Sequence, residues 1–246
     1  FAMELYQRGI ISRQETDGLK LEWGDEETML EMLNRIAYRK GFGNTLAEGS
    51  VIAAEKIGRG SEKYVMTVKC LEIPWTDPRS ATRGWSFGYI VGPRGDNVKM
   101  NHTTIGDVIS DGWGADDYDM LDEVREKIFG SPPKAHPFSY RGKAMTVKWV
   151  SEIFTALNTF CSCIFTVRAL GPTIYSRLIS ACTGWDIKPD ELMRLGEKII
   201  NLRRAYAARD GFTRKDDRWP DRFYNEPLPD GPSKGKILSR EETNRA

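Results

Sequence analysis

Apolar residues recur at helical spacing in the C-terminal half of the chain. The clearest helix is predicted over Pro189–Ala208, because proline suits a first turn and apolar residues follow every three or four positions. These apolar residues are Leu192, Leu195, Ile199, Leu202 and Tyr206. A second long helix is predicted from about Arg141 to Phe160, with Ala144, Val147, Phe154, Leu157 and Cys161 at helical spacing. From Gly211 onward the sequence is polar and interrupted by prolines, which predicts an ordered surface tail.

The N-terminal part of the chain predicts shorter helices. Phe1–Gly9 has the pattern of the end of a helix that is closed by glycine. Asp25 suits the N-cap of a helix that runs to about Lys40 and is ended by Gly41. The apolar residues on one face of this helix are Met29, Leu33 and Ile36.

The pattern changes in the middle of the chain. Thr45–Glu48 has the form of a capping box, and the helix that it opens is expected to stop at Gly58. Tyr64–Ile73 alternates between the two faces of a short predicted strand. Pro74–Asn101 is rich in glycine and proline, but it carries too many aromatic residues and arginines for a passive linker. A surface helix is predicted over Asp116–Phe129, so helical signals dominate and the predicted fold class is mainly α.

Composition narrows the class of protein. The chain is 40% hydrophobic and 29% charged, which is typical of a folded globular protein, and its formal net charge is only +1. The absence of a basic stripe argues against nucleic acid as a partner. Apolar stretches such as Ile164–Val167 are too short to cross a membrane. Four cysteines in 246 residues do not make a disulfide framework and fit a reducing, cytoplasmic setting.

The cysteines show no paired spacing of the kind that builds a metal site from one segment. Cys161 and Cys163 are separated by one residue, whereas Cys70 and Cys182 lie far away in the sequence. We therefore expect most of them to be small buried hydrophobic residues. A complete iron–sulfur site cannot be built from this chain, although one cysteine could complete a cluster begun elsewhere.

Two segments of the Gly/Pro-rich passage combine close backbone approach with cationic side chains. They are Trp75–Arg79 and Gly92–Lys99. Glycine and proline bring the backbone near a neighbour, and arginine and lysine donate hydrogen bonds to phosphate or to a polar heterocycle. A pair of tight turns with solvated charges explains the same residues equally well.

Two histidines and one acidic pair are further candidates for a functional site. His102 follows the Gly/Arg-rich passage and could act as an acid or base, although a lone histidine is more often structural. His136 lies between prolines and is expected to be exposed. The pair Asp216–Asp217 could bind a metal, but the sequence favours turn caps and surface ion pairs.

Several motifs, in order along nearly the whole chain, resemble the aldehyde ferredoxin oxidoreductase family. They are Phe1–Leu5, Asn44–Gly49, Val68–Pro74, Thr76–Arg79, Cys182–Trp185 and Gly211–Asp217, with Pro220 and Arg222–Phe223 after them. The chain is similar to the two helical domains that follow the family's β-rich pterin-binding domain. The resemblance implies a helical middle domain over residues 1–140 and a helical C-terminal domain over residues 141–246. It also implies that the chain is part of a longer protein, and the first residue is indeed Phe1 rather than Met.

This resemblance implies a chemistry as well. Family members oxidise an aldehyde with water to a carboxylic acid at a tungsten (or molybdenum) bis-pyranopterin. Electrons then pass through a [4Fe-4S] cluster to ferredoxin or another carrier protein. The missing N-terminal part would complete the cluster, and the protein could form a homo- or hetero-oligomer.

The family's second pterin loop, Asp-x-x-Gly-Leu-Cys, ends on a cluster ligand and matches Asn158–Cys163 here. This makes Cys163 the expected metal ligand, with Cys161 as the alternative in a shifted register, and Asn158 and Ser162 as cofactor-binding residues. The segment departs from the family motif at three positions: Asn158 stands in place of Asp, Cys161 in place of Gly and Ser162 in place of Leu.

The resemblance assigns further cofactor-facing and catalytic residues in the middle of the chain. Those expected to bind the cofactor are Asp77, Arg79, Arg94 and Lys99, and those expected to act in catalysis are Asn97 and His102. Asn97 stands where family members carry a histidine near the metal, and asparagine cannot shuttle a proton. Two alternatives stay open: a paralogue with another substrate, such as an aromatic acyl thioester that is reduced, and a cofactor-free helical scaffold that binds a partner.

Overall fold

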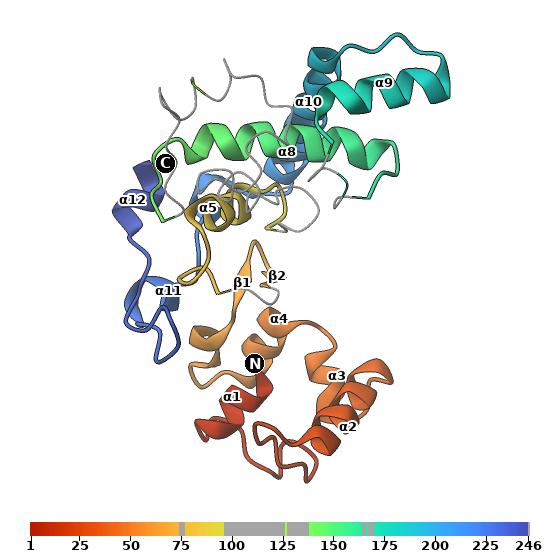
Figure 1. Cartoon of the computed structure of the whole chain (residues 1–246). Coiled ribbons are helices and arrows are strands. Elements are labelled where there is room, and N and C mark those ends of the chain that lie inside the picture. Colours follow the sequence, from red (N-terminus) through yellow and green to blue (C-terminus); the bar gives the residue numbers. More distant parts are fainter. Residues whose placement is uncertain (74–76, 96–125, 127–137, 164–165, 167–169, 246) are drawn as a thin grey trace. The chain divides into compact units, whose positions relative to one another are not determined.

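The computed structural model describes residues 1–73, 77–95, 126, 138–163, 166 and 170–245 (Figure 1). These residues form two compact units. The first comprises Phe1–Pro74 with Pro220–Arg222, and the second comprises Trp75–Trp219 with Phe223–Ala246. The fold is mainly α, as predicted, and the strands of the described part form one two-stranded sheet. The division into domains at residue 140 stays a prediction.

The first unit contains short helices and one hairpin. Its elements are α1 (Ala2–Gln7), α2 (Glu26–Ala37), α3 (Phe42–Leu46), α4 (Ser50–Ile57), the 3-10 turn η1 (Ser61–Tyr64), β1 (Thr67–Val68) and β2 (Leu71–Glu72). Its core is built by Leu5, Ile11, Leu21, Met32 and Phe42. The predicted end of a helix at Phe1–Gly9 is confirmed, and Gly9 has the left-handed conformation that closes such a helix.

The start of α2 was predicted correctly, but its end and its buried face were not. The side chain of Asp25 accepts a hydrogen bond from the Thr28 backbone N at 3.0 Å, as an N-cap should. The helix ends at Ala37 rather than near Lys40, because the chain turns sharply through Arg39 at φ 52°. Met29 and Leu33 are 45% and 60% exposed, whereas the buried residue is Met32.

The capping-box prediction was wrong. Thr45 lies inside α3, and the following helix, α4, begins at Ser50. Its first turn is capped from a distance, because the Ser50 backbone N donates to Oε1 of Glu72 at 2.8 Å. The predicted stop at Gly58 is confirmed.

The predicted strand over Tyr64–Ile73 is a tight hairpin instead. Thr67 pairs with Glu72 and Val68 pairs with Leu71 in antiparallel register. Lys69 and Cys70 form the turn with φ values of 51° and 62°. Two positive φ values in succession characterise the hairpin turns whose twist matches that of the strands.

The second unit is dominated by long helices. Its elements are α5 (Arg83–Val91), α8 (Lys143–Thr159), α9 (Pro172–Thr183), α10 (Pro189–Arg209), η5 (Arg214–Asp216), α11 (Arg222–Asn225, whose first residue groups with the first unit) and α12 (Arg240–Arg245). The predicted helices at residues 141–160 and 189–208 are confirmed as α8 and α10. The helix α5 was not predicted within the Gly/Pro-rich passage. The helix predicted over residues 116–129 lies, except for residue 126, outside the described residues, as does His136.

The core of the second unit forms where α8 packs against α9 and α10. Its buried residues are Val150, Ile153, Phe154, Ala156, Leu157, Tyr175, Ile179 and Leu192. The apolar stripe predicted on α10 is buried only at its start, because Leu202 and Tyr206 are 59% and 52% exposed.

The C-terminal segment is not a polar surface tail. Trp219, Phe223, Tyr224 and Leu238 are all buried. The indole Nε1 of Trp219 donates to Ser86 Oγ at 3.1 Å, so the segment is attached to α5. The sequence did not predict this burial, because most of these residues are aromatic side chains that do not recur at helical spacing. Among the described residues, no helix is long and apolar enough to span a membrane.

Candidate functional site

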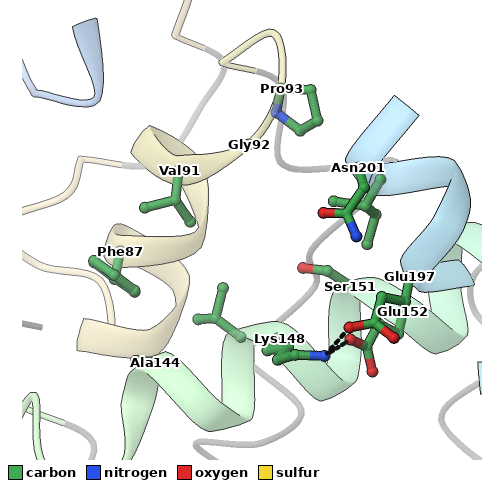
Figure 2. A pocket seen from close by; sticks show the side chains of 12 residues that line it. Phe87, Val91, Gly92, Pro93, Ala144, Lys148, Ser151, Glu152, Glu197 and Asn201 are labelled. Carbon is green, nitrogen blue, oxygen red and sulfur yellow. Dashed lines mark hydrogen bonds and ion pairs between the residues drawn. The ribbon is translucent and has the colours of Figure 1, made fainter. Parts of the chain in front are cut away.

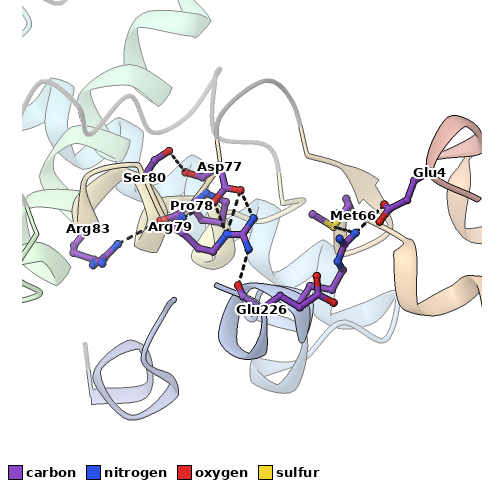
Figure 3. Close-up of polar contacts among 9 residues, drawn as sticks. Glu4, Met66, Asp77, Pro78, Arg79, Ser80, Arg83 and Glu226 are labelled. Atoms are coloured by element: carbon purple, nitrogen blue, oxygen red, sulfur yellow. Dashed lines mark hydrogen bonds and ion pairs between the residues drawn. The ribbon is translucent and has the colours of Figure 1, made fainter. Parts of the chain in front are cut away.

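Asp77 and Arg79 lie in the turn before α5 and bind each other (Figure 3). Asp77 Oδ1 accepts hydrogen bonds from the Arg79 backbone N at 2.8 Å and from Arg79 Nε at 3.0 Å. Arg79 Nη2 donates to Asp77 Oδ2 at 2.6 Å, and Arg79 Nη1 donates to the Glu226 carbonyl at 2.7 Å. Since the Arg79 side chain is only 11% exposed, this pair fixes the turn and neutralises its own charge.

Arg83 adds a second buried arginine that the sequence analysis did not single out. Its side chain donates to the Pro78 carbonyl at 3.3 Å. Its guanidinium lies 5.9 Å and 5.8 Å from the ring centroids of Phe138 and Tyr140, within the range of cation–π contacts. The turn from Asp77 to Arg83 therefore carries two cations for one carboxylate, a local excess of positive charge that suits an anionic group.

The loop after α8 presents two thiols. The helix ends at Thr159, and Cys161 then adopts a φ of 56°. Cys161 and Cys163 are free and exposed, as are Cys70 and Cys182. The prediction that most cysteines are buried was therefore wrong, and the reason at positions 161 and 163 is that the helix stops before them. Asn158 is also exposed on the last turn of the helix.

Hydroxyl groups of the loop after α8 contact a hydroxyl group of α9. Ser162 Oγ lies 3.2 Å from Tyr175 OH and 3.2 Å from Thr166 Oγ1. Thr166 Oγ1 donates to the Cys163 carbonyl at 2.6 Å and contacts Tyr175 OH. The Cys163 backbone is thus tied to α9, while its thiol stays accessible.

The remaining predicted site residues are placed only in part. Arg94 is exposed in the turn that follows α5, where Gly95 has a φ of 70°. Asn97, Lys99 and His102 lie outside the described residues. Nothing in the described part therefore relates these three side chains to Asp77 or to Cys163.

A pocket lies between α5, α8 and α10, next to the turn that leads to Arg94 (Figure 2). It encloses about 270 Å³, and its apolar walls include Phe87, Val91, Pro93, Val147 and Ile200. Small-molecule sites are commonly apolar with a few polar groups at one end. This pocket has that character, because its polar end is formed by Lys148, Ser151, Glu152, Glu197 and Asn201.

The charged end of the pocket is an ion-pair cluster. Lys148 Nζ donates to Glu197 Oε1 at 3.0 Å and also binds Glu152. Burial raises the pKa of the Glu152 carboxyl, and Lys148 offsets part of this effect. Burial lowers the pKa of Lys148, but its hydrogen bonds to Glu152 and Glu197 outweigh burial and raise the pKa overall. With all three groups ionised the cluster carries one net negative charge.

Sequence reasoning missed this cluster, although one signal was present. Lys148 and Glu152 are four residues apart within a predicted helix, a spacing that brings side chains together. Such pairs usually mark a solvated helix face. Here Glu152 is 8% exposed, because α10 packs over it.

Comparison with known proteins places the chain in a family. Residues 1–246 match the family model described as aldehyde ferredoxin oxidoreductase, domains 2 and 3. The chain belongs to the aldehyde ferredoxin oxidoreductase family. This confirms the resemblance in the motifs, and the mainly α fold agrees with it.

The relatives of this family member include proteins with different names. The chain is 33% identical over 244 residues to the tungsten-containing aldehyde ferredoxin oxidoreductase of Pyrococcus furiosus, covering 98% of the chain and 36% of that protein. It is 31% identical over 243 residues to the enzyme of the same name from Thermococcus kodakarensis, with the same coverage. It is also 31% identical over 252 residues to the aliphatic sulfonate oxidoreductase, WOR-like subunit, of Pyrococcus furiosus, covering 98% and 34%. The chain therefore spans little more than a third of these relatives.

A solved structure shares the fold. It is the active site complex BamBC of benzoyl coenzyme A reductase in complex with 1,5-dienoyl-CoA. The match covers 99% of this chain and 38% of the chain in that structure, with a TM-score of 0.71. Its sequence identity of 21% supports the fold alone.

The donor set of this aldehyde ferredoxin oxidoreductase family member fits one part of a cluster site. An exposed thiol on an anchored loop suits a single iron ligand. Among the described residues, no group of three His, Cys, Asp or Glu side chains could hold a metal ion. The described residues thus fit a single ligand position and not a complete metal site.

Proposed function

We propose that this chain forms the two helical domains of a tungsten-bispterin, iron–sulfur oxidoreductase, with molybdenum as the alternative metal. The observation that carries the proposal is the family match over all 246 residues, combined with relatives whose names state that they contain tungsten. The proposed reaction converts an aldehyde and water to a carboxylic acid, releasing two protons and two electrons. The metal–pterin group, when bound, supplies this two-electron chemistry.

The proposal gives the chain's residues specific tasks. Cys163, or Cys161 in the alternative register, would bind one iron of a [4Fe-4S] cluster as thiolate. Asn158 and Ser162 would face the cofactor from the same loop. Asp77, Arg79, Arg94 and Lys99 would line its anionic side, which the excess positive charge near Arg83 supports.

The reacting atoms are assigned to the neighbourhood of Asn97 and His102. The pocket beside Pro93 is the proposed place for the body of the substrate. Its apolar walls suit the body of a small aldehyde. Two electrons would then leave through the cluster to ferredoxin or a similar carrier, in the cytoplasm, and the protein could assemble as a homo- or hetero-oligomer.

A second candidate function is that of a paralogue with a different substrate. It is favoured by Asn97 at the position where family members carry histidine, since asparagine cannot transfer a proton. The relative named as an aliphatic sulfonate oxidoreductase supports such divergence. Reduction of an aromatic acyl thioester is one such reaction, and aldehyde-dependent reduction of a ferredoxin by the purified protein separates the two.

Replacement of single cysteines tests the cluster assignment. The change Cys163→Ala should remove most of the iron from the full-length protein when it is purified without oxygen, because a cluster iron loses its protein ligand. The change Cys182→Ala is the matched control, since that thiol is also exposed but lies on α9. Iron loss in Cys161→Ala instead would move the ligand to the alternative register. Unchanged iron in both variants would contradict the assignment.

A further inference from the structure

Tyr175 connects the hydrophobic core to the loop that carries Cys163. The residue lies in the first turn of α9, three residues after Pro172. Its ring is 5% exposed and packs in the core cluster with residues of α8, including Phe154 and Leu157. A ring held in this way gives its hydroxyl group a fixed position.

The hydroxyl of Tyr175 meets two residues of that loop. It lies 3.2 Å from Ser162 Oγ and contacts Thr166 Oγ1, and these two oxygens lie 3.2 Å from each other. A hydroxyl can donate one hydrogen bond and accept others, so three hydroxyls can satisfy one another in such a group. Ser162 and Thr166 stand on either side of Cys163 in the sequence.

We infer that Tyr175 is a positioning residue for the thiolate of Cys163. Thr166 Oγ1 donates to the Cys163 carbonyl, so the chain of contacts runs from the core through Tyr175 and Thr166 to the cysteine backbone. Groups that orient a metal ligand without touching the metal contribute strongly to metal affinity. The inference rests on the proposed function, because it takes Cys163 as the cluster ligand.

The test removes only the hydroxyl. The change Tyr175→Phe keeps the ring in the core. In the full-length protein, purified without oxygen, it should speed iron loss to a chelator by about 10-fold or more and shift the midpoint potential of the cluster. Tyr140→Phe is the matched control, because the Tyr140 hydroxyl lies 3.1 Å from Thr243 Oγ1, also in the second unit but away from the loop. It should leave both quantities unchanged.

A second readout needs no cluster. The Ser162 backbone N donates to the Leu157 carbonyl at 3.3 Å, so its amide exchanges hydrogen only when the loop opens. Tyr175→Phe should speed exchange in residues 158–163 by about fivefold, as expected for the loss of one hydrogen bond. Exchange along the rest of α9 should stay unchanged, which excludes simple unfolding of that helix.

The outcomes separate the two hypotheses. A wild-type protein without iron contradicts the proposed function and with it the role in positioning a cluster ligand, while faster exchange in the Tyr175→Phe variant would then show only that Tyr175 anchors the loop. A wild-type protein with iron, together with a Tyr175→Phe variant that matches it in iron loss, potential and exchange, overturns the inference and leaves the proposed function standing.

Discussion

Asp217 illustrates, at the scale of single residues, how the second unit accommodates a buried charge. Its side chain is 2% exposed, and its two oxygens accept hydrogen bonds from Nη1 and Nη2 of Arg204 at 3.0 Å and 2.9 Å. This bidentate arrangement offsets the cost of taking a carboxylate out of water. Asp216 instead caps a turn by accepting from the Thr213 backbone N at 2.7 Å. The pair thus has the structural role that the sequence favoured, but the ion pair is buried rather than on the surface.

Removal of Arg204 should therefore be costly. The change Arg204→Met leaves the Asp217 carboxylate without its bidentate partner and should lower the free energy of unfolding by about 2–4 kcal/mol. Chemical denaturation at neutral pH measures this difference. Arg209→Met on the same helix removes an arginine that is 72% exposed and should change the free energy by less than about 0.5 kcal/mol. Equal effects of the two substitutions would contradict a special role for the buried pair.

Which side chains cap the helices could be predicted from the sequence only in part. Asp25 was identified correctly as a cap, because its partner is three residues away. Glu72 was not identified as the cap of α4, because it lies 22 residues from Ser50. Local patterns reveal local partners, whereas a long-range partner depends on how the elements pack.

At the scale of elements, the crossing of α8 and α10 depends on one glycine. A Cβ atom added at Gly196 would lie 1.9 Å from the Glu152 carbonyl oxygen, which is far closer than van der Waals contact. Only glycine lets the two backbones approach this closely. The same contact covers Glu152 and so contributes to the raised pKa of its carboxyl.

The change Gly196→Ala should force these two helices apart. We expect a loss of about 1–3 kcal/mol in the free energy of unfolding, because overpacking displaces atoms that cannot rotate away. The helix propensity of alanine alone would act in the opposite direction. Lys198→Ala, at an exposed position on α10, serves as the control and should be nearly neutral. A Gly196→Ala variant as stable as wild type in thermal or chemical denaturation would show that the crossing is looser than described.

The elements that were predicted correctly are those with long helical periodicity. The helices α8 and α10 were identified within a few residues, since each runs for several turns. The helix α5 was missed because Gly84, Gly88 and its aromatic residues resemble a loop in composition, yet its residues from Arg83 to Ile90 are all buried. A helix that is buried on every side shows no alternation between polar and apolar faces, so periodicity cannot reveal it.

The candidate site was predictable only through family resemblance. The sequence alone left Cys161 and Cys163 as two cysteines without a metal-binding spacing, and it gave no role to Tyr175. The loop after α8 is anchored by hydroxyl contacts with Tyr175 of α9. These contacts depend on how α9 packs beside the end of α8, which the sequence pattern does not show. The pocket at Lys148, Glu152 and Glu197 likewise depends on three helices that are separate in the sequence.

At the scale of the whole molecule, family membership and chemistry rest on different evidence. The match to domains 2 and 3 establishes the family, while the chain spans only 36% of the Pyrococcus furiosus tungsten enzyme. A protein that shares a fold can carry a different activity. The proposed function therefore depends on whether this protein binds the metal and the iron that its relatives' chemistry requires.

Metal analysis of the full-length protein, purified without oxygen, shows whether the metal and the iron are bound. We expect tungsten or molybdenum together with about four irons per chain, as a single [4Fe-4S] cluster requires. We also expect the Cys163→Ala variant to lose iron. Well-folded protein that contains neither tungsten, molybdenum nor iron would contradict the oxidoreductase proposal and would favour a helical scaffold that binds a partner.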